Sequence, residues 1–330
     1  MSTCLEGVSR SFRSLAAALL VGACAVTALD AQTIDELRER VREAAGAAHL
    51  TTLVAGLVDL SENDDVSAGR LTITPGPDLD VDTWKLPWRR NVPLGDGRSE
   101  LHLEAGIGYF VSRSATDDVW GGGLPGLEAG LRTRWEGVSG FVGAGPRFDF
   151  GSGFHAGPVV DVSLSYVEND ALWSGPGAAQ TEALLDGVLF DWHATTLAYG
   201  VAGRLEHELR IAELRSLTSL VRYDVRRFDG IDSTDAAQDF EDTIQRLVVS
   251  SAYEAPTGLS FSGGPVLWEL RVAYTRYLGN DEDVLGFTDY YEVGCALESP
   301  SPILQTMRLS GALLFGEDVR GWSLGFSLTF

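Results

Sequence analysis

Cysteine, lysine and long apolar runs are all scarce in this 330-residue chain. Three cysteines, Cys4, Cys24 and Cys295, are too few for a disulfide framework or a cysteine-based metal site. Lys85 is the only lysine, and 25 basic against 47 acidic residues leave a net charge of −22. Such an acidic chain excludes nucleic acid as a partner, because phosphate binding needs basic contacts. After position 31 no apolar run reaches the roughly 20 residues of a transmembrane helix.

The first 31 residues have the pattern of an export signal. Arg10 and Arg13 precede an apolar run from Leu15 to Ala28, and small residues lead up to Ala31. We therefore expect a signal peptide over residues 1–31 that is cleaved after Ala31. Cys24 follows small residues inside the apolar run, so lipid attachment at this cysteine remains an alternative.

Residues 32–49 have helical periodicity. Thr33 and Glu36 form a capping box, and apolar side chains recur from Ile34 to Ala48 on one face. The sequence predicts a short N-terminal helix here, followed by a single β domain over residues 50–330.

From there to the end of the chain, apolar and polar residues alternate. The last segment is the clearest, because Trp322, Leu324 and Phe326 share one face while Ser323 and Gly325 share the other. A wholly apolar strand face is stable against lipid, and only helices and closed barrels satisfy their backbone groups in a bilayer. The alternation therefore predicts a closed antiparallel transmembrane β-barrel.

In other segments the second face carries charged side chains. An arginine facing lipid at mid-depth costs about 2–4 kcal/mol, so these charges belong on the inner face. The residues expected to line the lumen are Glu104, Glu128, Arg132, Arg134, Asp161, Arg222, Asp224, Arg226, Glu269 and Arg271. Whether they line an open pore or pair inside a plugged barrel stays open at this stage.

The number of strands follows from segments separated by Gly, Pro, Asp and Asn clusters. Thirteen candidates begin near Leu50, Val81, Glu100, Gly126, Val138, Phe154, Asp191, Leu214, Thr243, Val266, Tyr290, Gln305 and Gly321. Single-chain bacterial barrels have an even number of strands. We expect twelve, with Leu50 to Leu60 excluded; adding Arg70 to Thr74 gives the alternative of fourteen.

The C-terminus resembles the recognition signal that outer-membrane barrels present to their assembly machinery. The pattern is a polar residue, a glycine two positions later, and alternate hydrophobic residues ending in an aromatic one; here it is formed by Ser323, Gly325, Leu328 and Phe330. This resemblance implies the outer membrane of a Gram-negative bacterium. It also implies outer-membrane lipid and lipopolysaccharide, the barrel-assembly machinery and periplasmic chaperones as partners.

The whole arrangement resembles a solitary autotransporter-type barrel. The segments that carry the likeness are Trp84–Pro87 and Leu103–Tyr109, and it covers about Thr33 to Phe330. The resemblance implies a barrel with a leading helix and a structural, surface or small-solute pore role. The resemblance does not extend to the export of a passenger, which passenger-bearing autotransporters carry out. We expect no cofactor and no metal, since the histidines lack ligand spacing.

An outer-membrane hydrolase is the alternative function. The hydrolases to compare are the omptin proteases, which are also outer-membrane barrels. They use a pair of acids and an Asp-x-His pair at the barrel rim. Candidates here are Asp80 with Asp82, and Asp191 with His193. Against this alternative, His193 shares its strand face with Leu197, which is expected to face lipid.

Overall fold

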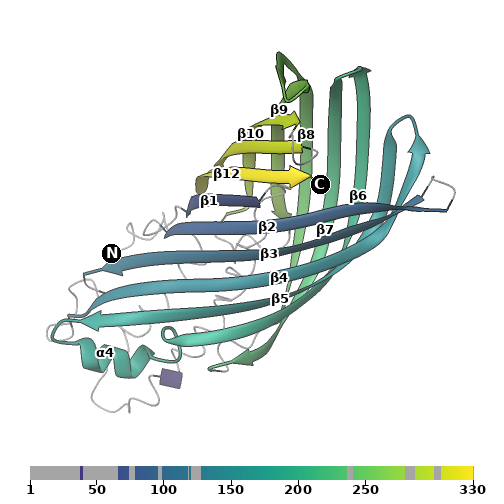
Figure 1. The fold of residues 1–330 in the computed structure, drawn as a ribbon. Coiled ribbons are helices and arrows are strands. Elements are labelled where there is room, and N and C mark those ends of the chain that lie inside the picture. The colour runs from purple at the N-terminus through teal and green to yellow at the C-terminus, as the bar shows by residue number, and fades with distance from the viewer. Residues whose placement is uncertain are drawn as a thin grey trace.

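The computed structural model describes residues 38–39, 66–73, 79–95, 99–117, 119, 128–235, 241–278, 287–300 and 306–329. Its strands form one closed antiparallel barrel, in which each strand pairs with its neighbours in sequence and β1 pairs with β12 (Figure 1). The expected all-β closed barrel of twelve strands is thus confirmed.

The strands differ greatly in length. They are β1 (Val66–Ile73), β2 (Leu79–Leu94), β3 (Ser99–Thr116), β4 (Gly130–Gly151), β5 (Phe154–Ser174), β6 (Trp192–Ala212), β7 (Arg215–Ser233), β8 (Glu241–Phe261), β9 (Gly264–Leu278), β10 (Asp289–Pro300), β11 (Thr306–Phe315) and β12 (Val319–Thr329). One helix, α4 (Ala178–Leu185), lies between β5 and β6. The longest strand, β4, has 22 residues and the shortest, β1, has 8, so one wall of the barrel is taller (Figure 1).

The two ends of the barrel differ in their connections. At one end lie 117–129, 175–191, 234–240 and 279–288, and we call this the long-loop end. At the other, the short-turn end, β4–β5, β6–β7 and β8–β9 are joined by two-residue turns, β1 begins and β12 ends. The barrel therefore has two distinct rims.

Alternation sorts the side chains into an outer and an inner face, as β12 shows. Trp322, Leu324 and Phe326 are 47%, 59% and 42% exposed on the outer face, whereas Ser323 is buried on the inner face. On β5 the outer apolar positions run from Phe154 to Tyr166. At about 3.3 Å per residue and a tilt of about 40°, this stretch is about 30 Å tall. We call this outer surface the apolar belt.

Two differences from the expected strand boundaries cancel in the count. The strands expected to begin near Gly126 and Val138 are one continuous strand, β4, because its pairing with β3 continues without interruption through this region. Residues around Arg70, which the twelve-strand prediction omitted, form β1 and close the barrel against β12. The segment Leu50–Leu60 lies outside the described residues.

Only a small part of the expected N-terminal helix can be compared. Arg38 and Glu39 are helical, and the rest of residues 32–49 lies outside the described residues. In the part of the chain that the structure describes, no helix is both long enough and apolar enough to cross a membrane.

Candidate functional site in the barrel lumen

The lumen contains charged side chains that are almost completely buried. Glu104, Arg222 and Asp224 are 2%, 3% and 2% exposed. Each lies on the inner face because its neighbours in sequence occupy the outer one, as Val221 and Tyr223 do on β7. Buried charges are stable only when they are paired and hydrogen-bonded, so the partners of these groups determine what the lumen can do.

Arg222 crosses the lumen to reach Glu104. Its two terminal guanidinium nitrogens each donate to one carboxylate oxygen of Glu104 at 3.1 Å. Glu104 belongs to β3 and Arg222 to β7, and β4, β5 and β6 lie between these strands in the barrel. The bidentate pair therefore joins distant parts of the wall through the interior.

Further ion pairs extend this contact. Arg222 Nε donates to Asp224 at 2.8 Å, and Arg246 on β8 donates to the second oxygen of Asp224 at 3.2 Å. On the other side, Arg89 Nε on β2 lies 3.7 Å from Glu104. We call these five residues the ion-pair bridge. Removing Glu104 or Arg222 would break a buried pair, at a cost of about 3–5 kcal/mol.

A second network occupies the lumen towards the short-turn end. Arg147 on β4 donates to Glu206 at 2.8 Å and to Glu100 at 2.5 Å. Arg204 pairs with the same Glu206 and hydrogen-bonds His102 at 3.0 Å. Charged groups from β3, β4 and β6 thus meet in the lumen near this rim.

Towards the long-loop end the inner face becomes apolar. Phe110, Phe228, Ile244 and Tyr277 are between 1% and 7% exposed. The side chains of this apolar layer come from all twelve strands, β4 contributing the partly buried Trp135, and one, Phe287, comes from the connection before β10. The buried members are Leu71, Ile73, Val81, Phe110, Val167, Trp192, Ala194, Ala198, Phe228, Ile244, Tyr277, Phe287, Tyr290, Leu314 and Val319. Their burial means that little of their surface is accessible to water.

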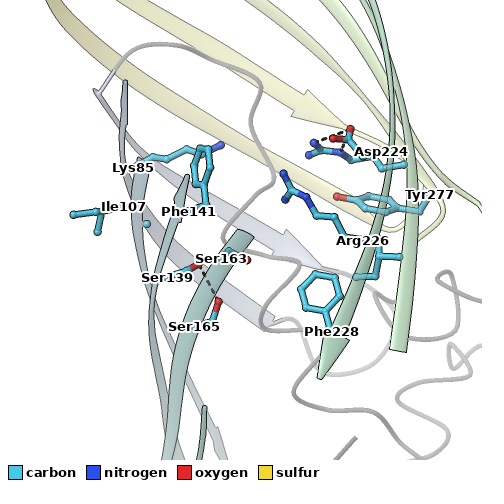
Figure 2. Close-up of a pocket in the computed structure, with 13 residues that line it drawn as sticks. Lys85, Ile107, Ser139, Phe141, Ser163, Ser165, Asp224, Arg226, Phe228 and Tyr277 are labelled. Carbon is cyan, nitrogen blue, oxygen red and sulfur yellow. Dashed lines mark hydrogen bonds and ion pairs between the residues drawn. The ribbon is translucent and has the colours of Figure 1, made fainter. Parts of the chain in front are cut away.

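A small cavity lies between the apolar layer and the ion-pair bridge. Its volume is about 40 Å³, room for a few water molecules. Figure 2 shows Lys85 and Arg226 extending from the walls, with Phe141 beside Lys85 and with Phe228 and Tyr277 beside Arg226. Ser165 donates to Ser139 across neighbouring strands at 2.9 Å (Figure 2).

Most of the residues expected to line the lumen lie on the inner face. These are Glu104, Asp161, Arg222, Asp224, Arg226, Glu269 and Arg271. Arg226 pairs with Asp161 at 3.0 Å, and Arg308 pairs with Glu269 at 2.7 Å. The alternation located these groups on one face but carried no information about which of them would meet.

Three of the expected lumen residues lie elsewhere. Arg132 and Arg134 share the outer face of β4 with Val138, and Glu128 is exposed in the connection before β4. The reason is that β4 projects past the apolar belt at the long-loop end, and there its outer face carries charged residues. There the apolar residue, Trp135, points inward and packs edge-on against Trp192 with ring centroids 5.4 Å apart.

The acidic pair proposed for a hydrolase lies on the outer face of β2. Asp82 accepts hydrogen bonds from Arg70 at 2.7 and 3.2 Å, and Asp80 accepts one from Thr72 at 2.7 Å. Both carboxylates are therefore engaged with β1.

The Asp-x-His candidates lie on another wall, with β3, β4 and β5 between them and β2. Asp191 accepts the backbone N–H of Ala171 at 2.8 Å, and burial raises the pKa of its carboxyl. His193 hydrogen-bonds Thr234 and stacks on Tyr166. The structure does not bring the two predicted pairs together. Among the described residues, no group of His, Cys, Asp and Glu side chains is arranged to hold a metal ion.

The C-terminal pattern lies on the strand that closes the barrel. Ser323 and Gly325 are buried on the inner face of β12 and face β1 and β11 in the pairing. Leu328 belongs to β12, and Phe330 lies outside the described residues.

The N-terminal segment contacts the long-loop end. Arg38 donates to the backbone oxygens of Ala183 and Asp186, both at 2.8 Å, at the C-terminal end of α4. A cation suits this position because unpaired carbonyls and the helix dipole make it negative. The sequence pattern predicted the helix over residues 32–49 that contains Arg38 but not this contact.

Comparison with solved structures finds β-barrels of similar fold. The translocator domain of autotransporter NalP from Neisseria meningitidis is 12% identical, with 87% of this chain and 97% of that chain covered and a TM-score of 0.48. The transport unit of autotransporter AIDA-I from Escherichia coli is 10% identical, with coverages of 87% and 99% and a TM-score of 0.49. The beta domain of the Bordetella autotransporter BrkA is 12% identical, with coverages of 80% and 97% and a TM-score of 0.47.

These proteins are of the type that the sequence resemblance named. At such identities and TM-scores the likenesses assign no function to this chain. No protein-family model matches the sequence, and no curated protein matches it.

Proposed function

We propose that this chain is an integral outer-membrane β-barrel with a sealed lumen, and that its role is structural or at the cell surface rather than in solute passage. The apolar belt supports membrane insertion, because its height of about 30 Å is close to the roughly 25 Å band of known outer-membrane barrels. In this placement the short turns face the periplasm and the long-loop end faces the cell exterior.

The apolar layer is the observation that carries the closed state. It takes side chains from every strand, whereas the ion-pair bridge crosses the lumen only as a line of groups. Apolar constrictions exclude water and ions by dewetting. The bridge adds to the closure by joining β2, β3, β7 and β8 through the interior.

Several expectations from the sequence are part of this proposal. Export would use a signal peptide over residues 1–31, and periplasmic chaperones would deliver the chain. The barrel-assembly machinery would recognise the pattern ending at Phe330, and the finished barrel would sit among outer-membrane lipid and lipopolysaccharide of a Gram-negative bacterium.

Conductance across a planar bilayer tests the sealed lumen. The inserted wild-type barrel is expected to show no steady single-channel steps. Phe110→Ala/Phe228→Ala removes two rings from β3 and β7 in the apolar layer, and we expect an ion leak in this variant. Phe148→Ala/Phe150→Ala makes the same chemical change on the outer face, where the rings are 43% and 70% exposed, and should stay silent.

Steady steps from the wild type would contradict the proposal and favour a small-solute pore. Insertion is verified in parallel by resistance to a carbonate wash and by a heat-modifiable band, so that silence is not confused with failure to insert.

A further inference from the structure

Arginines on the outer face are concentrated at the long-loop end. In the described part of the chain, those at or beyond the edge of the apolar belt there are Arg70, Arg113, Arg132, Arg134, Arg227, Arg276 and Arg320. Towards the short-turn end the outer face has Arg90 and Arg215. In a chain with a net charge of −22, the outer-face arginines therefore lie mainly on one side of the apolar belt.

Three of these residues form a compact group, the arginine triad. Arg113 on β3 and Arg134 on β4 stand directly opposite in the antiparallel register, and Arg132 is the next outer-face residue of β4, diagonal to Arg113. Arg113 and Arg132 are exposed, and the side chain of Arg134 is 49% exposed. Like charges directly opposite on one sheet face are destabilising, so an anion bound between these guanidinium groups would remove an existing repulsion.

The triad stands just beyond the apolar belt. Tyr109 and Val138 are opposite each other in the register and mark the edge of the belt, since Val138 is an exposed apolar side chain. Arg113 and Arg134 each lie four residues further towards the long-loop end. At about 3.3 Å per residue and about 40° of tilt, this is about 10 Å along the barrel axis. The guanidinium groups are therefore at the level of lipid headgroups.

Acidic neighbours reduce the positive charge of the triad but leave part of it. Arg134 pairs with Glu136 at 2.5 Å, and Tyr109 donates to the other oxygen of Glu136 at 2.5 Å. Asp170 is opposite Arg134 on β5. Glu136 holds Arg134 in place. Asp82 on β2 interacts electrostatically with Arg113, but no ion pair within 4 Å joins Arg113 or Arg132 to a described carboxylate.

We propose that Arg113, Arg132 and Arg134 bind the phosphate groups of a multiply phosphorylated lipid headgroup in the leaflet at the long-loop end. Guanidinium groups suit this ligand because each can donate two parallel hydrogen bonds to a phosphate. The inference rests on the proposed function, since only a membrane-inserted barrel meets lipid at this level.

Binding of bisphosphorylated lipid A to the full-length barrel in detergent, followed by native mass spectrometry, tests the site. The wild type is expected to retain this lipid in preference to its dephosphorylated form. Arg113→Gln/Arg132→Gln/Arg134→Gln should lower the affinity about tenfold or more, where tenfold corresponds to about 1.4 kcal/mol. The control is Arg90→Gln/Arg215→Gln, which removes outer-face arginines at the other rim and should bind as the wild type does.

Three outcomes would overturn the assignment. The first is equal retention of the bisphosphorylated and the dephosphorylated lipid, and the second is full binding by the triple variant. The third is that inorganic phosphate displaces the lipid equally from the triple variant and from the wild type. A heat-modifiable, carbonate-resistant barrel that gives any of these results contradicts the lipid site alone. A wild-type chain that does not insert into membranes contradicts the proposed function, and the lipid site with it.

Discussion

At the scale of single residues, two glycines allow β4 and β5 to approach closely. A Cβ atom at Gly145 would lie 1.8 Å from the backbone oxygen of Pro158, and one at Gly157 would lie 1.8 Å from that of Pro146. The regular pairing of β4 with β5 is interrupted here, between Ala144 and Phe148. A carbon atom at that distance would overlap with the backbone oxygen, so any side chain at these positions must move the strands apart.

We predict that Gly145→Ala lowers the free energy of unfolding by about 1–3 kcal/mol, the usual cost of overpacking. Gly203→Ala is the matched control, because a Cβ atom at Gly203 in β6 meets nothing within 4 Å. Urea unfolding of the refolded barrel in lipid vesicles, followed by its heat-modifiable band, measures both. Equal midpoints for the two variants would refute the close approach.

At the scale of elements, the connection around α4 contains a strained and partly buried acid. Asp191 has φ of 55°, in the left-handed region, and its side chain accepts the N–H of Ala171. Burial raises the pKa of Asp191, and the nearby Asp186 and Asp170 raise it further, against the lowering effect of the Ala171 hydrogen bond. A raised carboxyl pKa means that the folded state favours the protonated form. The stability that Asp191 contributes is therefore fully present at low pH, and it is lost as the pH rises through the pKa of Asp191 in the folded state.

Asp191→Asn should therefore tighten this connection at neutral pH. Asparagine is uncharged, keeps the acceptor oxygen and tolerates the left-handed conformation. We expect slower amide hydrogen exchange over residues 175–190 at pH 7, with the difference from the wild type vanishing below the ordinary pKa of an aspartate. Asp191→Ala, which loses the acceptor, should exchange faster than Asp191→Asn at both pH values. Identical exchange of Asp191→Asn and the wild type at pH 7 would show that burial of the charge costs nothing.

At the scale of the whole molecule, two leucines with similar exposure are expected to have different surroundings. Leu324 is 59% exposed in the apolar belt of β12, and Leu172 is 64% exposed on β5. Leu172 lies six residues beyond Tyr166, towards the long-loop end and outside the belt. In the proposed placement, lipid surrounds the first leucine and water or headgroups surround the second.

We predict that Leu324→Arg costs about 2–4 kcal/mol of stability in a bilayer, as expected for an arginine facing hydrocarbon. Leu172 stands directly opposite Arg132 on β4, so Leu172→Arg should cost less than about 1 kcal/mol, the scale of a like-charge pair across neighbouring strands. The folded fraction in vesicles across a urea series provides the comparison. Similar small costs at both positions would mean that no hydrocarbon surrounds β12.

The sequence predicted the fold more accurately than it predicted the boundaries of the strands. The alternation along β12 and β5 separated the two faces of each strand, because successive Cβ atoms point to opposite sides of any strand, and the apolar set was taken as the outer face. The same rule failed at Arg132 and Arg134. Alternation separates two faces without saying which is the outer one, and β4 leaves the apolar belt at that point. The residues around Arg70 were too few to be recognised as a strand without their pairing partners.

What the sequence by itself determined is local: closed β architecture, sorted faces, and charged residues on the inner face of most strands. What only the tertiary structure decided is which of these groups meet. Glu104 and Arg222 are 118 residues apart and touch only because the barrel closes with a particular register. The apolar layer is equally non-local, since Phe110 and Phe228 resemble outer-face residues until twelve strands bring them to one level. Alternation follows from covalent geometry, whereas contacts through the lumen depend on strand number, register and tilt, which no single segment contains.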